Sequence, residues 1–534
     1  MRPECFLKLF GFARQRATGA AIVLALLLAG CSAEDPAGDE PQQPAISIAA
    51  NTASEHEPVA DGQSFEPLPS LESDDGTPLE SSDPSSAETQ TKAKPEIPLP
   101  DAETKHRLPD DRPEINSARL QAAGIQLYRS ERLLLLSDLP AEKVARLPEL
   151  ADALFERLEQ HFGTLPAASD GSAFQVTGCL IGDEARFHAA GLMPAEQFGF
   201  EHGRHRNYQF WMFDQEQDYY RRHLLLHEFT HCFMTCESGM NDIPPLWYIE
   251  GMAEYFATHR LPQNNQPSFD RAAFGILPHS YSGFDGWGRI SELRRLASVP
   301  TDAGSLSIKP LPNVMPATVE VFRSDAQYAR SWCLCWLLQS HPVYRKAFQP
   351  LAGCRRRDEF LDVLATISAD IKHRLAIDWL LVRESLQEGF DTDRSFPIHA
   401  TAPLQPLNAT AVPTAIQAAA GWQQVPIRLE RDQIVFVECS GKFQVNDTLQ
   451  PWISEPQGVS VEYVRHRPLG CVLAVFVSEA ADRISSPQTV GVRADLTAPF
   501  DGTFWLQVND HSHSRADNDG EVRVVVKQGG QTSP

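Results

Sequence analysis

The sequence predicts a multidomain protein in which a mixed α/β (α+β) region precedes an all-β sandwich. In residues 111–395, apolar residues recur with helical spacing in some segments and form short strand-like runs in others. In residues 403–530, short alternating apolar runs are separated by turn residues, which is typical of antiparallel strands. A proline-containing stretch at 403–413 marks the boundary between the two regions.

The first thirty residues have the features of an export signal. Basic residues precede an uncharged run, 17–30, which is too short to cross a bilayer as a permanent helix. The run ends in Leu28-Ala29-Gly30-Cys31, which resembles the lipobox of bacterial lipoproteins. The resemblance implies cleavage before Cys31, a lipid on that cysteine and a membrane anchor, and Ser32 after it favours the outer membrane or cell surface. An ordinary secretory signal followed by a chance cysteine is the alternative.

The next segment, 31–110, has the composition of a disordered tether. It is rich in proline, serine and acidic residues, and residues 31–100 hold fifteen acidic residues against Lys92 and Lys94. Such a segment cannot bury enough apolar surface to fold, and its charge keeps it extended. It contributes more than half of the net charge of −23, so the negative balance does not indicate an acidic binding face. Without a basic stripe, no nucleic-acid partner is predicted.

Apolar patterning predicts the elements of the folded regions in chain order. In the α/β region we expect strands at 133–136, 174–181 and 208–213, and helices at 141–161, around 227–231, and at 246–258, 326–339 and 371–386. In the sandwich we expect strands at 434–437, 472–477, 504–508 and 522–526. Two large apolar residues of the helix expected at 246–258, Trp247 and Phe256, are expected in the core.

The stretch His227-Glu228-Phe229-Thr230-His231 is a candidate metal site. Two histidines four residues apart lie on the same side of a helix and can reach one ion. The short pattern alone is also compatible with a solvated helix face. Eighteen residues separate His231 from Glu250, which supplies a third ligand, and Glu254 lies one turn later and can accept a hydrogen bond from a ligating histidine.

This arrangement resembles the gluzincin metallopeptidases, and within them the peptidase MA-like group of bacterial exported proteins. The matching residues are His227, Glu228, His231, Glu250 and Glu254, together with the flanking Trp-Tyr-Ile-Glu-Gly-Met-Ala-Glu-Tyr-Phe. The resemblance implies a zincin-type fold over residues 111–395 and Zn²⁺ held by the two histidines and Glu250. Because no Gly-x-Met-Glu-Asn motif is present, the chain departs from the aminopeptidase branch, so endopeptidase action on a peptide or protein substrate is the expectation.

The expected chemistry assigns two further roles. Zinc lowers the pKa of its bound water and polarises the scissile carbonyl. Glu228 then acts as the general base, and Tyr328 is the candidate donor to the developing oxyanion. His223 is expected to be a polar surface residue or an orienting partner, whereas His188, His202 and His205 are expected in a polar surface loop.

Outside the cytoplasm disulfides become possible, and Cys439 with Cys471 is a plausible pair. The stretch 509–520 between two sandwich strands is rich in oxygen-bearing side chains, which suits Ca²⁺. It resembles the calcium loop of the bacterial galactophilic lectin family (LecA-like), whose members bind galactosides through the ion. In that likeness the calcium positions fall on Asp510, Ser514, Asp517 and Asn518, completed by a carbonyl near Val445. A turn rich in Asp, Asn and Ser is the alternative.

The sequence therefore predicts an exported, lipid-anchored zinc endopeptidase with a calcium-binding and glycan-binding sandwich. Two alternatives stay open. The first is a surface glycan-binding adhesin whose peptidase domain is inactive. The second is a peptidase whose sandwich is purely structural and binds neither ion nor sugar.

Overall fold

The structure is a computed structural model, and residues 103–534 belong to one compact unit. It describes residues 106–194, 200, 202–239, 242–261, 273–276, 289–297, 305–315, 324–447 and 450–530. The predicted signal peptide, the lipid site at Cys31 and the tether up to residue 105 lie outside the described residues. The chain is packed from Arg107 onward, because that buried side chain donates hydrogen bonds to the carbonyls of Pro166 and Ser172.

The first part of the chain forms a five-stranded sheet in the order β1-β2-β3-β5-β4. The three inner strands are parallel, and β1 and β4 are antiparallel edge strands. The predicted strands at 133–136, 174–181 and 208–213 are confirmed to within two residues. The strands are β1 (Gln126–Arg129), β2 (Leu133–Ser137), β3 (Val176–Ile181), β4 (Gly203–Arg206) and β5 (Gln209–Phe213).

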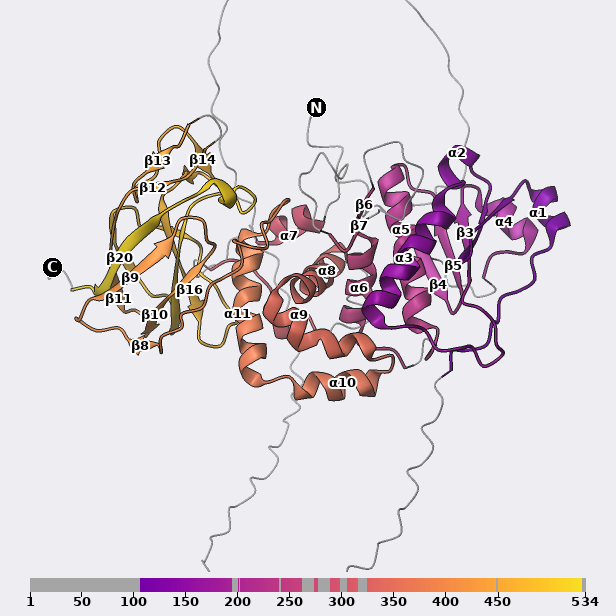
Figure 1. The fold of residues 1–534 in the computed structure, drawn as a ribbon, viewed down its shortest axis with the longest axis horizontal. Coiled ribbons are helices and arrows are strands. Elements are labelled where there is room, and N and C mark those ends of the chain that lie inside the picture. The colour runs from indigo at the N-terminus through magenta and orange to yellow at the C-terminus, as the bar shows by residue number, and fades with distance from the viewer. Residues whose placement is uncertain are drawn as a thin grey trace, which may run out of the picture. The chain divides into compact units, whose positions relative to one another are not determined.

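Helices cover both faces of this sheet. Alternate residues of each inner strand enter two separate cores, as strand geometry requires. Leu135, Leu180 and Phe210 pack with α3 and α5, and the opposite face packs with α1 and α4. Figure 1 shows α3 and α5 beside the sheet. The helices are α1 (Ser117–Ala123), α2 (Ala141–Val144), α3 (Leu147–Phe162), α4 (Glu184–Ala190) and α5 (Asp218–Thr235).

The single helix predicted at 141–161 is wrong, because the chain forms two helices there, α2 and α3. Pro148 occupies the first turn of α3, where its missing N–H is tolerated and the preceding helix cannot continue through it. The apolar spacing was right, since Val144, Leu150 and Leu154 are all buried.

A helical layer follows the sheet. Its helices are α6 (Leu246–Ala257), α7 (Arg289–Ala297), α8 (Asp325–Ser340), α9 (Pro342–Phe348), α10 (Arg357–Thr366) and α11 (Ala369–Ser385), with a short strand pair, β6 (His259–Arg260) and β7 (Ala273–Phe274). The three helices predicted here, at 246–258, 326–339 and 371–386, are confirmed to within two residues. A Cβ at Gly251 would lie 2.5 Å from the carbonyl oxygen of Ser331, so glycine lets α6 approach α8 closely. Among the described helices, none combines the length and apolar character needed to cross a membrane.

The C-terminal part is β-rich, as predicted, with two sheets in the orders β17-β16-β19-β10-β8 and β18-β11-β20-β9. Side chains from both sheets share one core, and all but the β8–β10 pair are antiparallel. The strands are β8 (Gln405–Pro406), β9 (Val412–Gln417), β10 (Gln423–Leu429), β11 (Ile434–Ser440), β12 (Phe443–Gln444), β13 (Ile453–Ser454), β14 (Tyr463–Val464), β15 (Arg467–Pro468), β16 (Val472–Ser478), β17 (Gln488–Thr489), β18 (Arg493–Thr497), β19 (Gly502–Val508) and β20 (Glu521–Gln528).

The sandwich shares a second core with the helical layer. The outward side chains of β16 and Trp505 of β19 belong to the same buried cluster as Trp336 and Phe390. His399 adds a polar link, because its Nε2 lies 2.6 Å from the buried carboxylate of Asp378 in α11. The suggested Cys439–Cys471 disulfide is wrong, because both thiols are free and buried.

Candidate metal centre

Helix α5 carries the predicted metal ligands in a buried environment. Fifteen of its eighteen residues are buried, so the helix has no broad solvated face. His227, Glu228 and His231 are 6%, 5% and 2% exposed, which rules out the interpretation of this stretch as a polar helix surface. Buried polar side chains need partners, so the contacts of these three residues decide what the stretch does.

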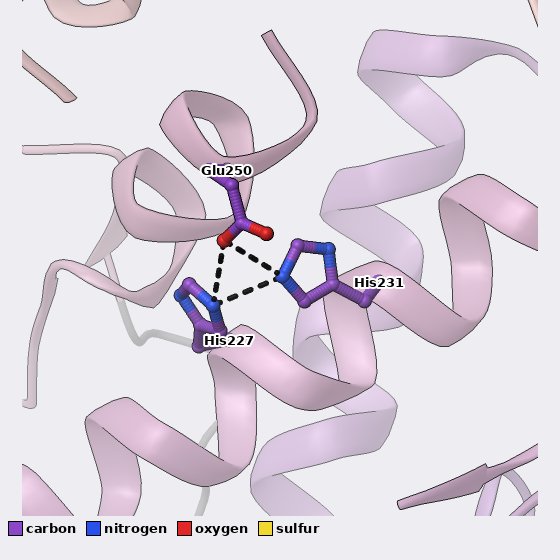
Figure 2. A group of neighbouring side chains, drawn as sticks. All are labelled: His227, His231 and Glu250. Atoms are coloured by element: carbon purple, nitrogen blue, oxygen red, sulfur yellow. Dashed lines mark hydrogen bonds and ion pairs between the residues drawn. The ribbon is translucent and has the colours of Figure 1, made fainter. Parts of the chain in front are cut away.

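The third predicted ligand comes from α6, which begins directly after Pro245. Oε2 of Glu250 lies 3.4 Å from Nε2 of His227 and 3.2 Å from Nε2 of His231. The two ring nitrogens are 3.0 Å apart. Figure 2 shows the three side chains pointing toward one another from two helices. Among the described residues, these three form the one group of His, Cys, Asp or Glu side chains arranged to hold a metal ion.

The spacing of these atoms fits a zinc ion. Ligands of tetrahedral zinc at about 2.0–2.1 Å lie roughly 3.3 Å from one another, close to the separations found here. Two imidazole nitrogens and one carboxylate are also the donor types that zinc prefers at hydrolytic sites. Nδ1 of His231 and Oε2 of Glu250 are buried without a hydrogen-bond partner. The residues present therefore fit the group that the sequence predicts.

Glu254 of α6 contacts His227 without forming a hydrogen bond to it. Its Oε1 is 3.4 Å from Nδ1 of His227, the ring nitrogen that faces away from the other ligands. It also accepts from His223 at 3.1 Å and from Arg289 of α7 at 3.0 and 2.7 Å. His223 is thus a buried orienting residue. Arg289 was not predicted, and its bidentate contact fixes the plane of the Glu254 carboxylate.

The electrostatic field at His227 favours positive charge, whereas burial lowers the pKa of the neighbouring His231. Burial, the largest influence, lowers the pKa of His227, but the contact with the Glu250 carboxylate and the charges of Glu254 and Glu228 outweigh it and raise that pKa to about 9. The pKa of Glu250 is lowered in turn, because its contacts with the two histidines outweigh its burial. A field that holds a proton on a buried imidazole also favours a divalent cation at the same place.

The expected general base, Glu228, lies beside the ligands and against the edge strand β4. Its Oε2 is 3.4 Å from Nδ1 of His205, whose ring stacks on that of His231 with centroids 4.3 Å apart. The prediction that His205 lies in a polar surface loop is wrong. It belongs to β4, and its side chain is 11% exposed. His188 lies on α4, where its side chain is exposed.

Tyr328 of α8, the candidate oxyanion donor, also reaches this site. Its ring centroid is 6.3 Å from that of His227, and the Arg289 guanidinium lies 5.5 Å from its centroid. The negative charge of Glu250, followed by burial and the charges of Glu254 and Glu228, raises the pKa of Tyr328. The phenol therefore keeps its proton at neutral pH and can donate a hydrogen bond.

The predicted calcium residues lie in the loop after β19. Oδ1 of Asp510 accepts from Ser514 at 2.8 Å, and its Oδ2 accepts from Asn518 at 2.8 Å. The carbonyl of Asp517 accepts from Gln444, which neighbours Val445. Oδ1 of Asp517 and Oδ1 of Asn518 are buried without a hydrogen-bond partner. Burial, then the charges of Asp510 and Asp447, raises the pKa of Asp517. Three of the four residues are thus in direct contact, and Asp517 is close enough to feel the charge of Asp510.

Comparisons with known proteins assign no family. No family model matches the chain, and no curated protein matches it. Among solved structures, one described as the EclA N-terminal domain, a PllA-like lectin, is 20% identical, covers 22% of this chain and 95% of its own, and has a TM-score of 0.18.

Two further solved structures are PliG, a periplasmic lysozyme inhibitor of g-type lysozyme. The protein from Aeromonas hydrophila is 10% identical, covers 25% of this chain and 99% of its own, and has a TM-score of 0.14. The protein from Salmonella Typhimurium is 9% identical, covers 25% and 97%, and has a TM-score of 0.12. Each likeness concerns about a quarter of the chain and scores too low to support an argument about family or activity.

Proposed function

We propose that this protein is a zinc-dependent endopeptidase, exported and anchored by a lipid on Cys31. The observation that carries the proposal is the convergence of His227, His231 and Glu250 beside the buried carboxylate of Glu228. Ligands from two packed helices and an adjacent carboxylate are the parts that metal-assisted hydrolysis of an amide requires. The lipid anchor rests on the sequence alone.

Each residue has a role in this proposal. A bound zinc ion supplies a Lewis acid that polarises the scissile carbonyl and acidifies the attacking water. Glu228 accepts the proton of that water and delivers it to the leaving amine. Tyr328 donates a hydrogen bond to the oxygen on which negative charge develops. Glu254 keeps the Nδ1 hydrogen of His227 in place, so that Nε2 faces the ion.

The position of the site at the sheet edge suits an extended substrate. β4 ends the five-stranded sheet and runs beside Glu228. A peptide that adds to such an edge is held by backbone hydrogen bonds along its length, with no need for a free terminus. This arrangement favours cleavage within a chain over removal of terminal residues.

The test combines metal analysis with a peptide library. The purified protein should contain one zinc per chain, cleave peptides internally, lose activity with chelator and regain it with zinc. Glu228→Gln should keep the zinc and lose roughly 10²–10⁴-fold in kcat, because only the proton transfer is removed. The matched control, Glu149→Gln, changes an exposed glutamate and should cleave normally. Absence of both stoichiometric zinc and cleavage would refute the proposal and leave the inactive adhesin. Cleavage by Glu228→Gln at the wild-type rate would refute the role of Glu228 as general base.

We infer a second function, binding of Ca²⁺ and a glycan by the Asp510 loop. It is supported by the two buried side-chain oxygens of Asp517 and Asn518 that have no partner. Calcium takes six to eight oxygen ligands and could use both of them. Titration calorimetry with CaCl₂, followed by a glycan array with and without calcium, tests the two steps separately. Absence of calcium binding would leave the sandwich with a structural role.

A further inference from the structure

The edge strand β4 presents two residues to the metal centre. Its antiparallel register pairs Gly203 with Met212 and His205 with Phe210. Residues opposite each other on paired strands share a face, and Met212 and Phe210 belong to the core that α5 covers. Gly203 and His205 therefore face α5.

Both residues meet the carboxylate of Glu228. A Cβ at position 203 would lie 2.3 Å from its Oε1, so any larger residue would displace the carboxylate from this position. Nδ1 of His205 faces the other oxygen, Oε2, at 3.4 Å. The carboxylate is thus enclosed between the backbone of β4 on one side and an imidazole on the other.

The hydrogen on the His205 ring can be assigned from this contact. A carboxylate only accepts hydrogen bonds, so an attractive contact requires the hydrogen on Nδ1. The contact is not a formed hydrogen bond, since Oε2 of Glu228 is buried without a hydrogen-bond partner, and contacts of this kind commonly tighten only when a substrate binds. Stacking on His231 restricts the imidazole plane, and Nε2 of His205 is buried without a partner.

We propose that His205 is a positioning residue, which holds the Glu228 carboxylate in its productive orientation through the Nδ1 hydrogen. This inference rests on the proposed function only in treating Glu228 as the general base. The glutamate side chain has three rotatable bonds, and a displacement of about 1 Å can cost roughly a hundredfold in rate. A fixed donor on the rigid strand, together with the close backbone at Gly203, restricts those rotations.

Three substitutions of His205 test separately the donor at Nδ1, a donor at Nε2 and the stacked ring. Asparagine places an amide donor near the position of Nδ1, glutamine places it near Nε2, and phenylalanine keeps the stacked ring without a donor. His205→Asn should cleave within about threefold of wild type. His205→Gln and His205→Phe should lose roughly 10–100-fold in kcat with little change in KM, because the base is misplaced while substrate binding remains. All three should keep one zinc per chain. Arg206→Gln, which changes the next residue on the strand, is the control.

Crystal structures of the metal-free variants give a readout that does not depend on activity. The Glu228 carboxylate should keep its orientation in His205→Asn and rotate in His205→Phe. Wild-type kcat in His205→Phe, or a greater loss in His205→Asn than in His205→Gln, would overturn the proposal. If wild type shows no cleavage that depends on Glu228, the proposed function fails, whereas the carboxylate orientations still decide whether His205 positions Glu228.

Discussion

The metal centre and the Asp510 loop both gather candidate ligands, but they do so in opposite ways. In the metal centre, His227 and Glu250 come from two packed helices and face each other with few other partners. In the loop, Ser514 and Asn518 lie within nine residues of chain and already hydrogen-bond to Asp510. The first arrangement is preorganised for an ion, whereas an ion in the second must replace hydrogen bonds that are already made. We therefore expect tight binding at the first site and weak binding at the second.

The largest expected effect follows from removing a ligand of the metal centre. Glu250→Gln removes the carboxylate charge while keeping the side-chain volume. We expect zinc affinity, measured by competition with a chromophoric chelator, to fall by more than the roughly 100-fold that loss of an outer partner can cost. Glu149→Gln is the control. Undiminished zinc affinity would show that zinc is held elsewhere and would contradict the assignment of a preorganised metal centre.

Acid should destabilise the part of the fold beside the metal centre through His259. Its Nδ1 donates to the carbonyl of Ala257 at 2.8 Å, and its Nε2 accepts from Arg222 at 3.1 Å. The second contact requires the neutral ring, because a protonated Nε2 cannot accept a hydrogen bond. Burial lowers the pKa of His259 to about 3. Because the unfolded chain takes up this proton from about pH 6.5 downward, stability is lost as the pH falls from 6.5 toward 3.

The measurement is urea unfolding of metal-free protein at pH 7 and pH 4.5. Wild type should lose roughly 2–3 kcal/mol more over this interval than His259→Gln, whose amide keeps a donor and an acceptor but does not titrate. Metal-free samples exclude the acid release of zinc as the cause. Equal losses of unfolding free energy in the two proteins would mean that protonation of His259 does not destabilise the folded state.

Local sequence patterns predicted the metal ligands because helical spacing brings His227 and His231 together without reference to the rest of the fold. They could not predict Arg289, whose contact with Glu254 joins residues 35 apart through the packing of α7. His205 was missed because β4 has only four residues and no apolar alternation. One signal was available, since Asn207, with φ of 49°, lies in the tight turn between β4 and β5, where asparagine is favoured.

The same limit applies to the fold. Two long strands were predicted: β16, which is a continuous run of buried residues, and β20, in which buried and exposed residues alternate. β-Branched residues mark both. Short elements such as α9 and β12 were not, because they form where neighbouring segments pack and carry little periodicity of their own.

A smaller loss of zinc affinity is expected when the changed residue orients a ligand and does not bind the ion itself. Arg289→Met keeps a long side chain but removes both hydrogen bonds to Glu254. Zinc affinity should fall by roughly 10–100-fold, because the Nδ1 partner of His227 is no longer fixed. Arg295→Met on the same helix removes an ion pair with Glu292 and is the matched control. If the two variants bind zinc equally, Arg289 contributes to packing alone.

The smallest expected effect belongs to the Asp510 loop. With a dissociation constant of about 1 mM, typical of weak extracellular calcium modules, 10 mM Ca²⁺ should stabilise the protein by about 1.4 kcal/mol. Asp510→Asn removes the charge that a cation needs and should abolish this gain, whereas Asp519→Asn, an exposed residue of the same loop, should keep it. Urea unfolding with equal concentrations of CaCl₂ and MgCl₂ measures both effects. If calcium stabilises the protein by more than about 4 kcal/mol, its concentration exceeds the dissociation constant about a thousandfold. Such tight binding would show that the loop, like the metal centre, is preorganised for its ion.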